Sequence, residues 1–202
     1  MISKIVEKIL FYFPNINKCQ QEKLSLLYDI YFYWNQRINL ISRKDFPNFY
    51  EHHVLHSLAL TRFLNTKTHK TVLDVGTGGG FPGIPLAILF PNTHFFLLDS
   101  IQKKLMVVNE IISSVKLYNV TTIRQRIETH QTEYDCVLGR AVKNLNQFIG
   151  WTKKNVKPNG TILYLSGGDI TYVPNLHIKI FNIAEIFSEP FFESKKIIQI
   201  YF

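Results

Sequence analysis

A short stretch near the middle of the chain combines a carboxylate with closely spaced glycines. Residues 72–83 read Val-Leu-Asp-Val-Gly-Thr-Gly-Gly-Gly-Phe-Pro-Gly. An apolar run ends at Val75, and the glycines after it let the backbone turn tightly and approach a ligand closely. A helix is expected over 82–90, since proline costs little at a helix start. A strand, a glycine turn and a helix in this order predict the first unit of a nucleotide-binding α/β fold.

The acid before this turn indicates which ligand the turn would hold. Gly78, Gly80 and Gly83 also satisfy the G-x-G-x-x-G spacing of dinucleotide-binding enzymes, so the glycines alone do not choose the cofactor. Asp74 stands two residues before Gly76, at the end of the apolar run, where its charge would repel a pyrophosphate. S-adenosylmethionine fits better, because it carries an ammonium and a sulfonium group and no phosphate.

A second acid supports this interpretation. Asp99 ends the apolar run 95–98, and an acid at the end of the second strand is placed to accept hydrogen bonds from ribose hydroxyls. The alternative is a generic turn, with Asp99 capping a helix that starts near Ile101. The coincidence of two acids with the glycine turn favours the cofactor site.

Groups after two later strands complete the candidate site. Arg140 follows the strand-like run 135–138, where it would hold an anionic substrate group, sit against the cofactor or form a structural ion pair. Ile127 and Glu128 follow another strand, at a position where backbone groups can meet an adenine edge. Glu128 is equally typical of a helix start.

Histidines and an aromatic–amide segment precede the glycine turn. His52 and His56 stand four residues apart, as metal ligands on a helix do, but no third ligand or H-E-x-x-H pattern accompanies them. An RNA-facing or capping role is therefore favoured. Residues 34–40 mix an aromatic ring, amides and a cation ahead of Arg43 and Lys44. The mixture suits RNA contacts, but the spacing slightly favours a helix end whose amides cap backbone groups.

Composition narrows the classes of protein to consider. The 202 residues, 46% of them hydrophobic, suit one α/β domain with a small extension. The net charge of +8 indicates an anionic partner such as RNA or DNA. Cys19 and Cys136 make no disulfide framework, and Cys136 is expected to be buried. Without a membrane-length apolar run or a signal-peptide cleavage site, we expect a cytoplasmic protein that does not bind membranes.

Apolar spacing divides the chain into a helical region, 1–66, and an alternating core, 67–202, expected to pack as one unit. The alternation predicts a mostly parallel, doubly wound sheet, with the ligand at the carboxyl ends of its strands. Helices are expected over 2–13, 17–34, 49–64, 82–90, 101–116 and 144–155. Strands are expected over 71–75, 94–98, 120–125, 135–138 and 161–166, with a terminal antiparallel pair at 177–183 and 196–202.

Together these motifs resemble the RsmG (GidB) family of small-subunit ribosomal RNA methyltransferases. The resemblance covers about residues 34–168, and its most specific parts are Gly-Phe-Pro-Gly-Ile-Pro-Leu at 80–86 and Arg-Ala-Val at 140–142. It implies a class I S-adenosylmethionine-dependent methyltransferase fold with an N-terminal helical extension, and we expect a monomer. The resemblance implies that Gly76, Phe81, Ile127, Glu128 and Arg140 contact the cofactor. The motifs described above add Asp74, Gly78 and Asp99.

The resemblance implies methyl transfer to N7 of one guanine in the decoding-region loop of 16S ribosomal RNA. N7 is a lone-pair acceptor on the base edge, so it attacks without first losing a proton. Positioning and electrostatics then suffice, and no general base is nominated. The guanine must be exposed or flipped, and Phe81 and Arg140 are candidate stacking partners.

Four positions depart from the family pattern. Gln36 stands where Lys is usual, His56 where many members have Asp, Thr129 where a second acid is usual, and Ser166 where Lys commonly precedes Gly167. These departures keep open a ribosome-binding protein without catalysis. An NAD-dependent oxidoreductase on the same fold is a further alternative, against which Asp74 argues.

Overall fold

A central seven-stranded sheet organises the protein, in the strand order β3-β2-β1-β4-β5-β7-β6. The computed structural model describes residues 4–140, 144–168 and 176–202. Strands β1 to β5 are parallel, and β7 runs antiparallel to both β5 and β6. The doubly wound sheet and the terminal antiparallel pair are thus both confirmed. The strands are β1 Thr71–Val75, β2 His94–Asp99, β3 Val120–Arg124, β4 Tyr134–Arg140, β5 Val156–Gly167, β6 His177–Asn182 and β7 Lys195–Tyr201.

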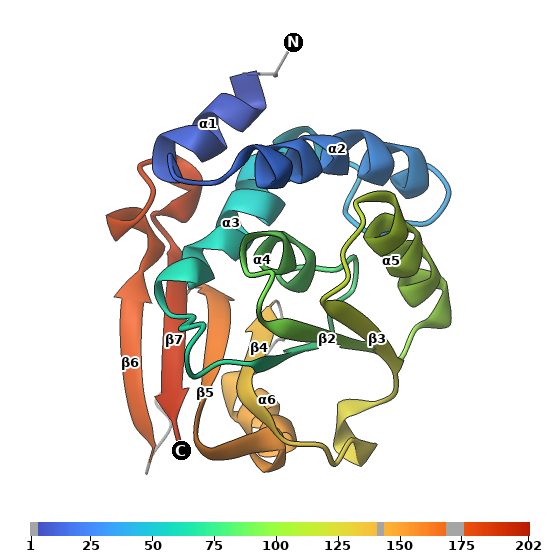
Figure 1. Ribbon diagram of the computed structural model, residues 1–202. Coiled ribbons are helices and arrows are strands. Elements are labelled where there is room, and N and C mark those ends of the chain that lie inside the picture. The colour runs from blue at the N-terminus through green and yellow to red at the C-terminus, as the bar shows by residue number, and fades with distance from the viewer. Residues whose placement is uncertain (1–3, 141–143, 169–175) are drawn as a thin grey trace.

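Helices cover both faces of this sheet. Figure 1 shows α4 and α5 on one face, with α2 beyond them, and α6 on the other face. Val72 packs into the core on the α4 side and Leu73 into the core on the α6 side, because successive side chains of a strand point to opposite faces. Cys136 is buried, as expected, and Cys19 is exposed. The helices are α2 Lys18–Asn35, α4 Gly83–Leu89, α5 Gln102–Ser114 and α6 Leu145–Thr152.

The N-terminal region packs α2 over α4 and α5 (Figure 1). It begins with α1, Lys4–Tyr12, and the predicted start of α2 is confirmed by a capping box in which Asn17 and Gln20 each accept from the other's backbone N–H. None of the helices in the described part of the chain has the length and apolar character of a membrane span.

The expected regular helix over 49–64 is wrong in detail. This stretch is helical, but it passes from the π-helix η2, Phe49–Leu55, through a single α-turn, α3 His56–Leu58, to the 3-10 helix η3, Ala59–Arg62. Apolar periodicity reports which face is buried and not the hydrogen-bond spacing, so the sequence did not reveal the change. Such π segments are frequent at functional sites. The remaining short helices are η1 Phe46–Asn48, η4 Ile127–Thr129, η5 Lys153–Asn155, η6 Ile183–Glu185 and η7 Pro190–Phe192.

Candidate active site

The glycine turn follows β1 and needs glycine for two different reasons. Gly76, Gly78 and Gly80 have φ values of 68°, 58° and 91°, a region that L-residues with side chains rarely adopt. A Cβ atom added at Gly76 would meet nothing within 4 Å, so this backbone faces open space. At Gly83, a Cβ atom would lie 2.1 Å from Leu97 Cδ2 and 2.9 Å from Asp74 Oδ2. Gly83 is thus required for packing, whereas Gly76 leaves room for a ligand.

Asp74 is buried at the end of β1, directly under this turn. Its Oδ2 accepts hydrogen bonds from the Thr77 hydroxyl at 2.6 Å and from the Gly83 N–H at 2.9 Å. Its Oδ1 has no hydrogen-bond partner among the described residues. Burial raises the pKa of Asp74 to about 6, since a low-dielectric surrounding disfavours the charged form. A buried acceptor without a partner is costly unless a ligand supplies the donor.

Asp99 ties the glycine turn to the start of α5. Its Oδ2 accepts from the Gly78 N–H at 3.0 Å and its Oδ1 from the Ile101 N–H at 2.8 Å. Ile101 itself is the N-cap residue, so Asp99 does not take the helix-capping position considered as the alternative. Each carboxylate oxygen can accept a further hydrogen bond, which keeps the ribose role available.

Ile127 and Glu128 lie in η4, shortly after Gln125, which is hydrogen-bonded to Asp99. The backbone link is the hydrogen bond from the Gln125 N–H to the Asp99 carbonyl, 3.2 Å long. Ile127 is buried, whereas the Glu128 side chain is exposed and takes part in no hydrogen bond or ion pair with the described residues. The sheet thus brings Asp74, the glycine turn and Asp99 into direct contact, with Ile127 and Glu128 at the edge of the group.

Arg140 ends β4, which pairs with β1 at the point where the strand order reverses. One guanidinium nitrogen lies 3.2 Å from His53 Nδ1 and another 3.5 Å from the His52 carbonyl. Its Cζ lies 5.2 Å from the centroid of the Phe81 ring. Burial lowers the pKa of Arg140 to about 10, so it stays cationic at neutral pH. No described carboxylate forms an ion pair with it, contrary to the structural alternative.

Asp45 is a residue that sequence reasoning missed. Its carboxylate accepts from His52 Nδ1 and from His53 Nε2, the latter at 2.8 Å. Because Nε2 of His53 then carries the proton, Nδ1 is free to accept from Arg140. Burial and the nearby Arg140 charge lower the pKa of His53 to about 4. The sequence carried no marker for this chain of contacts, because Arg140 lies 87 residues from His53 along the chain.

Of the two roles expected for the histidines, RNA-facing or capping, the RNA-facing one is wrong for His56. This side chain is buried, and its ring packs against Phe191 and Phe192. Burial lowers the pKa of His56 well below its usual value. His52 stacks on Phe191, with ring centroids 3.7 Å apart. His52 and His56 thus hold the η7 segment against η2 and α3. In the described part of the chain, no group of metal-ligating side chains gathers around the histidines.

Phe81 is not placed to stack on a flipped base, which corrects that expectation. Its side chain is 3% exposed, with ring centroids 5.0 Å from Tyr31 and 5.9 Å from Phe49. The Tyr31 hydroxyl donates to the Gly79 carbonyl at 2.6 Å. This aromatic cluster supports the underside of the glycine turn, and any cofactor contact of Phe81 stays a prediction.

The capping alternative for residues 34–40 is confirmed at Asn35. Its amide oxygen accepts from the Leu40 and Ile41 N–H groups at 2.9 and 3.0 Å, and its Nδ2 donates to the Ile41 carbonyl at 2.9 Å. This holds Leu40 against the turn, where a Cβ atom at Gly79 would lie 3.3 Å from Leu40 Cβ. Arg37 folds back over the Tyr33 ring, 3.7 Å from its centroid.

Lys195 lies beside Ser166 and Gly167, where the resemblance led us to expect a lysine before the glycine. Ser166 pairs with Lys196, and Gly167 pairs with Lys195, across the antiparallel β5–β7 ladder. A Cβ atom at Gly167 would lie 3.3 Å from Lys195 Nζ, which also lies 4.7 Å from the centroid of the Phe191 ring. A cation therefore occupies this edge despite Ser166. Ala141 and Val142, part of the motif around Arg140, lie outside the described residues.

Comparison with known proteins matches this chain to one family over most of its length. The sequence profile of the GidB family, described as rRNA small subunit methyltransferase G, matches residues 20–172. The chain is 42% identical to the ribosomal RNA small subunit methyltransferase G of Flavobacterium johnsoniae, over 96% of this chain and 97% of that protein. It is 45% identical to the protein of the same name from Bacteroides thetaiotaomicron, over 96% and 98% of the two chains.

Similar solved structures support the fold. A putative O-methyltransferase from Nostoc punctiforme superposes with a TM-score of 0.60 at 15% identity, over 74% of this chain and 56% of that chain. M. jannaschii TYW2 in complex with AdoMet gives 0.58 at 16% identity, over 75% of each chain. A SAM-dependent methyltransferase from Aquifex aeolicus gives 0.56 at 15% identity, over 77% and 92%. The expected class I, Rossmann-like methyltransferase fold is thereby confirmed.

Proposed function

Because the chain belongs to the rRNA small subunit methyltransferase G family, we propose that it transfers a methyl group from S-adenosylmethionine to N7 of a specific guanine in 16S ribosomal RNA. Family membership supports an enzyme that methylates ribosomal RNA of the small subunit. The methyl donor, the guanine, its N7 atom and a cytoplasmic location belong to the proposal.

One observation carries the assignment of the donor. Asp74 Oδ1 is a buried acceptor without a partner, and it lies beside a glycine turn whose backbone at Gly76 faces open space. A cationic donor group would satisfy this oxygen, whereas a pyrophosphate would be repelled by it. The same carboxylate therefore argues against the NAD-dependent alternative.

The residues that would hold S-adenosylmethionine fit its separate parts. Asp74 suits the ammonium group, Asp99 the ribose hydroxyls, and the backbone at Ile127 and Glu128 the adenine edge. Gly76 and Gly78 let the main chain approach closely. When bound, S-adenosylmethionine supplies an electrophilic methyl group on a sulfonium centre.

In this proposal, Arg140 lies between the bound donor and the RNA and orients the target base. Its guanidinium is held on one side by His53 and backed by Phe81, and it stays cationic because its pKa is lowered only to about 10. A fixed planar cation can orient an anionic or aromatic group. Guanine N7 needs no deprotonation, so orienting the base and excluding water are the tasks left to the protein.

The charge distribution supports an RNA substrate. The net charge is +8, and among the described residues only Lys8 and Lys157 of the lysines and arginines form ion pairs. Arg43, Lys44 and Lys195 thus remain available for phosphates. Binding that neutralises phosphates releases counterions and weakens steeply with added salt.

Calorimetry followed by a transfer assay tests the proposal. The protein is titrated with S-adenosylmethionine, S-adenosylhomocysteine and NAD, and then mixed with tritium-labelled donor and small ribosomal subunits from cells lacking this methylation. We expect binding of the first two ligands, no binding of NAD, and tritium in the RNA. Tight binding to the subunits without transfer would instead favour the non-catalytic alternative.

A further inference from the structure

Two cavities adjoin at the carboxyl end of α2, outside the donor site. The larger has a volume of about 600 Å³ and is walled by the rings of Tyr28, Phe32 and Phe46. Arg43 lines this cavity and also the second one, whose volume is about 380 Å³. The aromatic cavity and the polar cavity therefore meet at Arg43. The second cavity is lined by Asn39, Ser42, Arg43 and Lys44.

The aromatic rings border an open slot whose floor is the buried core residue Phe46 and whose exposed wall is Phe32. The rings of Tyr28 and Phe32 are nearly parallel, with an interplanar angle of 6° and centroids 6.2 Å apart. Phe46 lies 5.4 Å from Tyr28 and 5.8 Å from Phe32, centroid to centroid. Phe32 remains 49% exposed, so part of its surface is free. Exposed aromatic surface of this kind stacks with nucleobases, because every base has a π-face.

The polar side chains around the slot are free to bind a ligand. Gln36, Arg43 and Lys44 are exposed, and their side chains take part in no hydrogen bond or ion pair with other described residues. None of the described residues that line either cavity is acidic. Unpaired cations beside an aromatic slot complement a phosphate beside a base, whereas a purely apolar protein segment would leave these charges without partners.

The slot is joined to the donor site through two short chains of contacts. Asn35 lines the larger cavity, and its side chain holds Leu40, which lies against Gly79 of the glycine turn. On the other side, Phe46 directly follows Asp45, which binds His53 and through it Arg140. An RNA whose target base reaches the donor site would therefore pass close to the slot.

We propose that this slot binds one unpaired nucleotide of the substrate RNA, other than the guanine that is methylated. Its base stacks against Phe32 and its phosphate pairs with Arg43 and Lys44. The volume lies within the range of roughly 300–1,000 Å³ that is usual for small-ligand sites. That the RNA is ribosomal rests on the proposed function. That a nucleotide binds here rests on the residues of the slot.

The test compares matched variants in binding a fluorescently labelled adenylate hexanucleotide. Phe32→Ala is expected to raise the dissociation constant at least about fivefold, because stacking on an aromatic side chain contributes that much or more per base. Its control is Tyr118→Ala, since Tyr118 is 87% exposed, lies just before β3 and lines neither cavity. Melting curves and donor affinity must match those of the unaltered protein.

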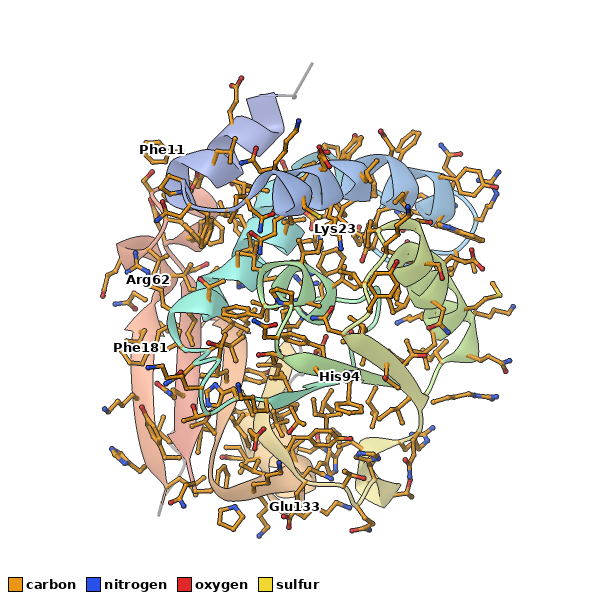
Figure 2. All side chains as sticks on the ribbon, viewed as in Figure 1. Phe11, Lys23, Arg62, His94, Glu133 and Phe181 are labelled. Atoms are coloured by element: carbon orange, nitrogen blue, oxygen red, sulfur yellow. The ribbon has the colours of Figure 1, made fainter. Side chains whose placement is uncertain are left out.

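The proposed phosphate contact is tested with a second pair of variants, one at the slot and one as a control. Arg43→Gln is expected to weaken binding and to reduce its salt dependence, whereas Arg62→Gln is expected to do neither. Arg62 is exposed in η3 and lies on the far side of the molecule from the α2 carboxyl end (Figure 2). Both arginines lack ion pairs among the described residues, so the two substitutions remove the same free charge from different places.

The outcomes separate this inference from the proposed function. Hexanucleotide binding that is unchanged in Phe32→Ala, or weakened equally in Tyr118→Ala, overturns the nucleotide slot. Unchanged hexanucleotide binding with a raised KM for small subunits also overturns it, and points to a ribosomal protein segment as the occupant. If the unaltered protein transfers no methyl group, the proposed function fails, while the hexanucleotide titration still decides about the slot.

Discussion

Nδ1 of His53 lies 3.2 Å from a guanidinium nitrogen of Arg140, while Nε2 of the same ring lies 2.8 Å from Asp45 Oδ2. Because the carboxylate accepts at Nε2, it fixes the tautomer in which Nδ1 accepts from Arg140. The pKa of His53, lowered to about 4 by burial, keeps the ring neutral at pH 7. Asp45 thus orients Arg140 without touching it.

Removing the Asp45 carboxylate should disturb this orientation. In Asp45→Ala, we expect kcat for methyl transfer to fall about tenfold, which corresponds to the loss of one hydrogen bond to a charged group. Asp45→Asn keeps one acceptor oxygen and should recover part of the rate. Glu110→Ala, an exposed acid on α5, is the control. A rate in Asp45→Ala equal to that of the control would show that Arg140 does not depend on this contact.

Donor binding should weaken in mild acid because of Asp74. The pKa of Asp74 is raised to about 6 by burial, so the carboxylate is ionised above this pH and neutral below it. The dissociation constant for S-adenosylmethionine should be constant above about pH 7 and rise toward tenfold per unit below the pKa, since one proton must leave for binding.

Asp74→Asn provides the matching variant. The amide oxygen can still accept from Thr77 and Gly83, but the negative charge is gone. We expect weaker binding by roughly 1.5–3 kcal/mol and little change in affinity between about pH 5 and 7. Calorimetry over this pH range would refute the ammonium assignment if the variant kept the pH dependence of the unaltered protein.

A methyl group at Gly76 should block the donor more than it destabilises the fold. Gly76→Ala places a Cβ atom in space that no described atom occupies within 4 Å, and the positive φ costs roughly 1–2 kcal/mol of stability. Gly150→Ala is a control, since its Cβ atom also meets nothing within 4 Å and helices favour alanine. We expect donor binding to be lost only in the first variant. Normal calorimetric affinity in Gly76→Ala would place the donor elsewhere.

Arg140→Ala should lower methyl transfer much more than the melting temperature. The guanidinium forms no ion pair with described residues, so its removal costs the fold little beyond the contacts with His53 and Phe81. Arg140→Lys should not restore the rate fully, because the planar fork is lost. Activity per folded molecule and thermal melting are measured on the same samples. A variant that melts early but retains full specific activity would make Arg140 structural.

The sequence predicted the elements that local patterns encode. Asp74 and Asp99 could be placed because each ends an apolar run, and the limits of α2 were expected to within one residue from the apolar spacing. The carboxyl ends of parallel strands meet at one edge, so the position of Arg140 at that edge also followed, whereas its place beside β1 was not predicted. Strand and helix limits shifted by a few residues, with β5 extending back to Val156.

The features of the site that the sequence did not predict depend on contacts with segments distant along the chain. The Asp45–His53–Arg140 chain joins a loop, a π-helix and a strand, and no local pattern announces such an arrangement. Phe81 was expected near the substrate because of its motif, but Tyr31 and Phe49 bury it. An RNA-facing role was one of the two favoured for His56, whereas the η7 phenylalanines cover it. Burial by a distant part of the chain is a tertiary effect, and the spacing of residues within one segment does not reveal it.

Mass spectrometry of nuclease-digested RNA tests the central claim most directly. Small ribosomal subunits lacking this methylation are incubated with the protein and S-adenosylmethionine, and their RNA is digested to nucleosides and to oligonucleotides. The proposal predicts 7-methylguanosine at one position of 16S RNA, in an amount that falls as salt is added. Methyl groups on a ribose 2′-oxygen, on cytosine or on protein would contradict it.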